Sequence, residues 1–235
     1  MELLVLTDFH FAAAGARSTI PSRRGDLIPD ILRRVRERET GLDAVAVLGD
    51  VIENGRHPAA ADDLRAVYEA LRRFDVPVLA VPGNHDRSPA LFERVFGPYE
   101  PIKVGEVRLL PVIDLYDEED VCTVDMEAVQ RTLSSIEPGE TAVVCQHSAI
   151  LPKVESSYPY TPPAYLEIAE TYRKAGVALS LSGHYHDGMP PVMDADVMHL
   201  CVPALCESPF SYARLTIRNG RIDVLIRNLG GRTEE

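Results

Sequence analysis

Short apolar runs recur along the chain, and each run ends beside polar side chains that can bind a metal ion. The runs are rich in Val, Leu and Ala, and they span residues 3–6, 44–48, 78–81, 142–145 and 178–181. Continuous apolar runs of this length are typical of buried strands in a parallel sheet. We therefore predict that these five segments are strands of such a sheet.

Amphipathic segments separate these runs. Residues 26–38 place Leu27, Ile31, Leu32 and Val35 on one face of a helix and basic side chains elsewhere. The same spacing predicts helices over residues 59–74, 126–136 and 163–175. Because a strand follows each helix, the alternation predicts a layered α/β domain.

The C-terminal part of the chain has a different pattern. Residues 212–217 and 221–226 flank Asn219-Gly220, a dipeptide that favours a two-residue hairpin turn. We expect this hairpin in a second, more antiparallel sheet. The chain has 235 residues, of which 46% are hydrophobic, so we expect one core and a single domain over residues 1–235.

The charge and the N-terminus narrow the functional classes. A net charge of −12 disfavours a nucleic-acid partner, which needs Lys and Arg to displace counterions. It permits a small phosphorylated substrate, because bound metal ions reverse the local field. Residues 1–6 are too short for a signal peptide or a membrane span, and no two of the four cysteines form a CxxC pair. We therefore expect a cytoplasmic protein with reduced thiols and no membrane partner.

Ligands of parallel sheets gather beyond the carboxyl ends of the strands, so the five polar clusters are expected to meet along one edge. The clusters supply two Asp, one Asn and four His, which is enough for two metal ions: Asp8, His10, Asp50, Asn84, His147, His184 and His186. Alternate residues of an extended segment point the same way, so each pair two residues apart can reach one ion. The two carboxylate oxygens of Asp50 can bridge two ions.

Other roles are open for several of these residues and their neighbours. Asp8 and Asp50 could be helix N-caps, but their company of four histidines favours ligands. The loops 11–25 and 148–163 both follow ligand-bearing strands and should border the site. The arginines and tyrosines of these loops could contact a substrate or belong to the ordinary surface: Arg17, Arg23, Arg24, Tyr158 and Tyr160. The same two roles are open for His57. The acidic run 117–120 is expected to be a solvated turn.

As a set, these clusters resemble the motifs of the calcineurin-like metallophosphoesterase superfamily. The pattern D-x-H, G-D, G-N-H-D, H and G-H-x-H occurs here in that order between Asp8 and His186. The resemblance implies a four-layer αββα sandwich in which two mixed β-sheets are flanked by helices. It also implies a dinuclear centre, and ligation by nitrogen and oxygen without thiolate favours Mn, Fe or Zn.

The resemblance also implies individual roles. Asp8, His10 and His186 would form the first metal site, Asn84, His147 and His184 would form the second, and Asp50 would bridge them. His85 would face the phosphoryl group and protonate the leaving oxygen, while Asp86 would orient its imidazole.

Within the superfamily, segments 49–55 and 81–86 are most similar in spacing to the class III cyclic-nucleotide and glycerophosphodiester phosphodiesterase group. Gln146 departs from that group, many of whose members have a second histidine here. The resemblance implies hydrolysis of a small-molecule phosphodiester by a hydroxide that bridges the metals. Because the short chain leaves little material for a large cap, we expect the site to be an open groove. The alternatives are a phosphomonoesterase and, from another class, a non-catalytic interaction module on the same fold.

Overall fold

Two mixed β-sheets form the centre of the protein, which the computed structural model describes over residues 1–13 and 18–230. Arg17 therefore lies outside the described residues. The first sheet has the strand order β13 (Arg221–Asn228), β12 (Ser211–Arg218), β1 (Glu2–Leu6), β2 (Ala44–Leu48) and β3 (Val78–Val81). The second sheet has the order β10 (Met189–Asp194), β11 (Val197–Cys201), β9 (Val177–Ser182), β8 (Thr141–Cys145), β5 (Val107–Pro111) and β4 (Ile102–Val104).

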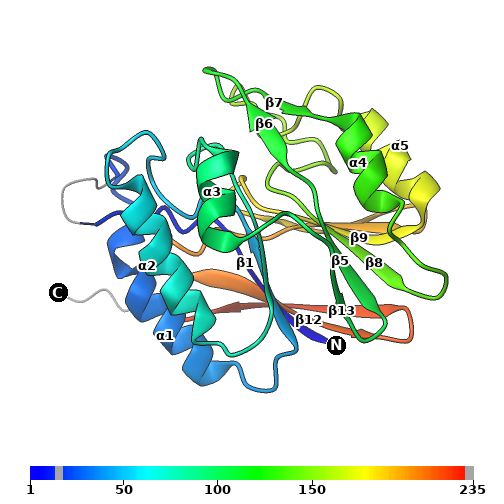
Figure 1. Ribbon diagram of the computed structural model, residues 1–235, viewed down its shortest axis with the longest axis horizontal. Helices are drawn as coiled ribbons and strands as arrows, with labels where there is room; N and C mark the ends of the chain where they lie inside the picture. The colour runs from blue at the N-terminus through cyan, green and yellow to red at the C-terminus, as the bar shows by residue number, and fades with distance from the viewer. Residues whose placement is uncertain (14–17, 231–235) are drawn as a thin grey trace.

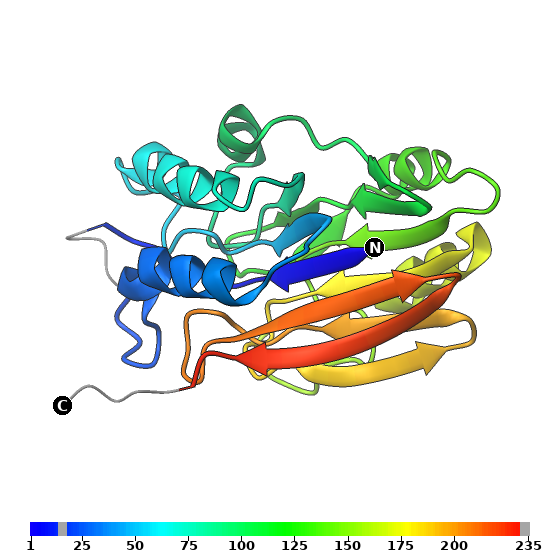
Figure 2. The same cartoon turned by 90° about the horizontal axis from the view of Figure 1, so that it is seen from below.

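Helices cover the outer faces of both sheets (Figures 1 and 2). The 3-10 turn η1 (Gly25–Leu27) leads into α1 (Ile28–Arg38), which lies on the side of the first sheet with α2 (Ala60–Arg72) and α3 (Pro89–Phe96). On the side of the second sheet lie α4 (Met126–Leu133) and α5 (Tyr165–Ala175). The four helices expected from amphipathic spacing are confirmed, and α3 is an addition to them.

Three apolar layers hold these elements together. Leu4 and Leu6 of β1 pack beneath the helices of the first sheet, whereas Leu3 and Val5 point into the layer between the two sheets. This alternation is the ordinary geometry of a strand whose two faces are both buried. A third layer, which includes Tyr172 of α5, joins the second sheet to its helices. The predicted αββα sandwich is therefore confirmed.

The five predicted strands all form, but they do not belong to one parallel sheet. β1, β2 and β3 are parallel neighbours in the first sheet, whereas β8 and β9 are parallel neighbours in the second. A strand buried on both faces has the same apolar composition in either sheet, so its own residues do not reveal its neighbours. The carboxyl ends still meet, because the two sheets pack face to face.

The C-terminal hairpin forms around Asn219 and Gly220, whose φ angles are 52° and 74°. It extends the first sheet, with β12 antiparallel to β1, so its expected place in the second sheet is wrong. The physical reason is that Leu215 and Ile217 of β12 fill the layer between the sheets beside β1.

A small separate hairpin lies near the strand ends, and the sequence pattern did not predict it. It consists of β6 (Asp114–Tyr116) and β7 (Cys122–Val124), and Figure 1 shows it between α3 and α4 at the top of the view. We call residues 114–124 the β6–β7 hairpin. No helix in the described residues combines the length and the apolar character needed to cross a membrane.

Candidate metal centre

The turns after the strands have an unusual backbone at four predicted ligands. Asp8, His10, Asp50 and His184 have φ angles of 54°, 46°, 49° and 67°, in the left-handed region that non-glycine residues seldom occupy. Such a conformation costs about 1–3 kcal/mol, so the surrounding structure must hold it in place. Backbone bonds between the turns do so, because the amide of Asp8 donates to Gly49 O at 3.0 Å and that of His10 to Asp50 O at 2.9 Å.

The structure brings the predicted first ligand set together. The Nε2 atoms of His10 and His186 are 3.1 Å apart. Asp8 Oδ1 lies 3.5 Å from His186 Nε2, and Asp50 Oδ2 lies 3.6 Å from His10 Nε2. These four atoms face one point from three different loops.

The second ligand set lies on the other side of Asp50. Ligand atoms of Asp50, His147 and His184 are all within 4.8 Å of one another, and Asp50 Oδ2 is 3.4 Å from His147 Nε2. The same oxygen thus faces both sets. Asp50 Oδ1 instead accepts the backbone N–H of His85 at 2.8 Å. The geometry favours bridging by one oxygen in place of the two that the sequence suggested.

The residues fit a metal centre because several of their inward-facing atoms have no hydrogen-bond partner in the described part of the chain. Within the described residues, four buried ligand atoms form no hydrogen bond: Asp8 Oδ1, Asn84 Oδ1, His147 Nε2 and His184 Nε2. Buried polar atoms in folded proteins are almost always satisfied, so each orphan atom needs an explanation. Two bound cations would supply the missing interactions for all four.

The outer atoms of the ligands are held by hydrogen bonds. Asp8 Oδ2 accepts the Thr7 hydroxyl at 2.7 Å, and His147 Nδ1 donates to Leu48 O at 2.6 Å. His186 Nδ1 donates to Glu207 Oε1 at 2.8 Å. Partners of this kind fix the ring orientation and leave Nε2 free for a metal ion. The sequence carried no local signal for Glu207, which lies 21 residues beyond His186.

The charges of the site are unevenly distributed. Burial alone would lower the pKa of every imidazole here, and it lowers the pKa of His10 to about 4. The carboxylate of Asp50 outweighs burial at His147 and raises its pKa to about 10, while Asp8 raises the pKa of His186 to about 9. A metal ion must displace these two protons, so metal loading is favoured as the pH rises.

His85 lies over the first set, but Asp86 does not orient it. The rings of His85 and His10 are 4.5 Å apart, edge to face. His85 Nδ1 donates to the backbone carbonyl of Glu53 at 2.7 Å. The Asp86 carboxylate accepts the amides of Gly83 and Ile52 at 2.8 and 3.1 Å, so it braces the turns beneath the site. The predicted role of Asp86 beside the imidazole is therefore wrong.

Glu53 is a further residue of the site that sequence reasoning missed. Its Oε2 lies 3.0 Å from His10 Nδ1 and 3.6 Å from Arg23 NH1. It follows Asp50 by three residues, and this proximity was the only signal in the sequence.

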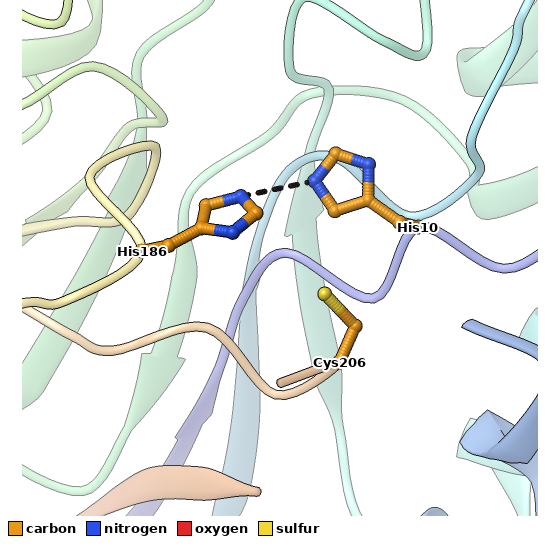
Figure 3. A group of neighbouring side chains, drawn as sticks. All are labelled: His10, His186 and Cys206. Atoms are coloured by element: carbon orange, nitrogen blue, oxygen red, sulfur yellow. Dashed lines mark hydrogen bonds between the residues drawn. The ribbon is translucent and has the colours of Figure 1, made fainter. Parts of the chain in front are cut away.

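Cys206 forms part of the floor beneath the first set. Figure 3 shows its side chain beside His10 and His186, and its Sγ lies within 4.8 Å of a nitrogen of each imidazole. The amide of Cys206 donates to Asp8 O at 3.1 Å, which places the thiol there.

A cavity of about 570 Å³ opens over both sets. Arg23 is its one arginine or lysine among the described residues, and Tyr158 and Tyr160 also line it. Asp120 also lines the cavity, so the acidic run is not wholly a solvated turn. Arg24 points away and pairs with Asp26 at 3.3 Å.

His57 does not line this cavity. Its Nδ1 accepts the amide of Ala59 at 3.2 Å just before α2. His57 therefore supports the turn before α2 and does not face the candidate site.

Gly83→Ala should cost the protein its bound metal and some stability. A β-carbon at this position would lie 2.3 Å from Asp50 Oδ1 and 2.5 Å from Asp50 N, which is closer than atoms can approach. The bridging carboxylate must therefore move. We expect fewer than two metal equivalents by elemental analysis and a free energy of unfolding lower by about 1–3 kcal/mol. Gly105→Ala is the control for metal content, because its β-carbon would meet nothing within 4 Å, while its φ of 60° makes alanine costly for stability there as well. Equal metal content in both variants would contradict the prediction.

Comparisons with known proteins identify a family and related folds. A family model described as calcineurin-like phosphoesterase matches residues 1–188. No curated protein matches the chain. Solved structures also match the chain, but their sequence identities to it are low, so they show the fold alone.

One of them is a dimetal phosphatase from Danio rerio (LOC 393393), at 16% identity and a TM-score of 0.76, with 97% of this chain and 96% of that chain covered. The protein TT1561 of Thermus thermophilus matches at 14% identity and a TM-score of 0.63, with coverages of 95% and 97%. The purple acid phosphatase PPD1 from yellow lupin (Lupinus luteus) seeds matches at 13% identity and a TM-score of 0.66, with 97% of this chain and 51% of that chain covered. Since the family model covers most of the chain and its motif residues converge on one site, the chain belongs to the calcineurin-like phosphoesterase family.

Proposed function

We propose that this metal-dependent phosphoric ester hydrolase cleaves a small-molecule phosphodiester with two transition-metal ions. Asp8, His10 and His186 would hold the first ion, Asn84, His147 and His184 the second, and Asp50 would bridge them. The observation that carries the proposal is the set of buried, unpartnered ligand atoms that converge beneath one cavity. The nitrogen and oxygen donors favour Mn, Fe or Zn.

When bound, the two ions would activate a water molecule and offset the charge of the phosphate. The chain itself would contribute the proton donor and the positioning groups. His85 lies at the cavity beside the first set, with its Nδ1 fixed by the Glu53 carbonyl, so its Nε2 is available to protonate the leaving oxygen. Arg23 NH1 lies 3.5 Å from that nitrogen and could clamp a phosphate oxygen on the same side.

The charge of the cavity wall supports a diester over a monoester. Glu53, Asp120 and Glu207 line the cavity, and Arg23 is the one arginine or lysine among the described lining residues. A phosphodiester carries one negative charge, whereas a monoester carries close to two near neutral pH. The two ions would attract either ester, and the acidic side chains of the wall oppose the second charge of a monoester. The motif spacing of the class III phosphodiesterase group points the same way.

Two alternatives make different predictions. A phosphomonoesterase would use the same ions with the opposite substrate preference. A non-catalytic interaction module would bind neither two ions nor a phosphate ester productively. The presence of His85 beside a full set of ligand residues favours an enzyme.

The test compares two aryl substrates. The Mn(II)-loaded protein should hydrolyse bis(para-nitrophenyl) phosphate with a kcat/KM at least about tenfold above that for para-nitrophenyl phosphate, a difference of about 1.4 kcal/mol. Arg23→Met should raise KM for the diester, whereas Arg24→Met, which alters the neighbouring exposed arginine, should not. A clear monoester preference would assign the phosphatase alternative, and no hydrolysis of either ester would assign the interaction module.

A further inference from the structure

We propose that Tyr158 and Asp120 are positioning residues for the second metal ion, because they hold the Asn84 amide with its oxygen toward that ion. Asn84 Nδ2 donates to the Tyr158 hydroxyl at 3.2 Å, and that hydroxyl donates to Asp120 Oδ2 at 3.0 Å. The three side chains form a relay from the β6–β7 hairpin to a metal ligand. The inference rests on the dinuclear site of the proposed function.

The orientation of the Asn84 amide decides whether it can bind a cation. Asn84 is 1% exposed, and its Oδ1 is buried without a hydrogen-bond partner in the described residues. A rotated amide would direct two N–H donors at the cation and repel it. A partner that accepts from Nδ2 therefore favours the binding orientation.

Asp120 sets the direction of the hydrogen bonds in the relay. An ionised carboxylate can only accept, so it takes the single O–H of Tyr158. The phenol oxygen is then left as an acceptor toward Asn84 Nδ2. Without Asp120, the hydroxyl could turn its proton toward Asn84 and support the wrong amide orientation.

Asp120 is itself held by the loop that carries Asn84. Arg87, three residues after Asn84, places its NH2 2.7 Å from Asp120 Oδ1. Its NH1 donates to the backbone carbonyl of Asp117 at 3.1 Å. The loop after β3 and the tip of the β6–β7 hairpin are thus tied at two points, with Tyr158 between them.

Tyr160 offers a natural comparison. Its ring lies 4.8 Å from the ring of Tyr158 and 5.2 Å from that of His184, so it shares the same wall. In the described residues, however, only the Tyr158 hydroxyl bonds to a ligand of the second set. A role that merely covered apolar surface would be common to both rings, whereas the relay belongs to Tyr158.

The experiment measures Mn(II) affinity by calorimetric titration and the formation of the coupled dinuclear centre by electron paramagnetic resonance. Tyr158→Phe should weaken the second ion by about 10- to 100-fold, as is usual for residues that orient a ligand, and leave the first ion unchanged. Tyr160→Phe should behave as the wild type. Asp120→Ala should also weaken the second ion, whereas Glu118→Ala, at the same hairpin tip, should not. The double variant Tyr158→Phe/Asp120→Ala should be no weaker than Tyr158→Phe alone.

Unchanged affinity for the second ion in Tyr158→Phe would overturn the relay, and so would equal weakening of both ions. Retention of the first ion shows that a variant is folded; if Tyr158→Phe does not fold, Asp120→Ala decides in the same way. A wild-type protein that binds fewer than two ions would instead overturn the dinuclear site of the proposed function. The two failures are therefore distinguishable.

Discussion

Asp50→Asn should leave the protein folded but unable to hold its metal pair, with kcat/KM lower by at least about a thousandfold. The loss of metal-ion stabilisation, worth several kcal/mol in the transition state, sets this magnitude. The reason is the position of one atom. Asp50 Oδ2 lies 3.6 Å from His10 Nε2 and 3.4 Å from His147 Nε2, so it serves both ligand sets. An amide nitrogen at that position would present protons to both ions.

The asparagine variant distinguishes a loss of metal binding from a loss of the fold. Its remaining oxygen can still accept the His85 amide, which Asp50 Oδ1 accepts at 2.8 Å. Metal analysis after reconstitution with Mn(II) gives the result, and far-ultraviolet circular dichroism checks the fold. Asp50→Ala should lose the same ions and also this hydrogen bond. Two ions retained in Asp50→Asn would contradict the bridging role.

His85→Ala should lower kcat by about 10²- to 10⁴-fold, the usual contribution of a general acid, while both ions stay bound. Its Nδ1 is engaged by Glu53 O, and its ring lies at the cavity above the first set. The loss should be smaller for an aryl ester with an activated leaving group, because such a group needs less protonation. Steady-state rates over a series of aryl leaving groups measure this difference.

A histidine outside the cavity provides the control. His57→Ala should keep kcat near the wild-type value, since His57 bonds locally in the turn before α2 and does not line the cavity. His85 also has a ligand atom within 4.8 Å of those of His10 and Asp50. Loss of one metal ion in His85→Ala would therefore make His85 a ligand instead of an acid. Equal losses for good and poor leaving groups would leave only an electrostatic role.

Local patterns were enough to predict many of the elements and which side chains the structure brings together. The apolar run 44–48 forms a strand that is buried throughout, and Ile31, Leu32 and Val35 form the buried face of α1. The candidate ligands directly follow the strand ends, so a prediction of the strands also predicted where these ligands lie. Strands, helix faces and the polar residues at strand ends all depend on residues that are close together in the sequence.

The partners of those residues were not predictable from the same patterns. The run 142–145 belongs to a different sheet from 44–48, although both have the same apolar character. Asp86 follows His85 directly, yet its carboxylate turns to the amides of Gly83 and Ile52. Adjacency along the chain did not determine which way this side chain points.

The sequence by itself determined the strands that precede the polar clusters, the C-terminal hairpin, four of the helices and the side chains at the strand ends, because periodicity and strand ends depend on residues a few positions apart. The tertiary structure alone decided which strands pair and which oxygen of Asp50 faces both ligand sets. It alone joined Tyr158 to Asp120, 38 residues away, and His186 to Glu207. Such contacts depend on how whole layers pack, and packing sums weak interactions over distant segments that no local pattern records.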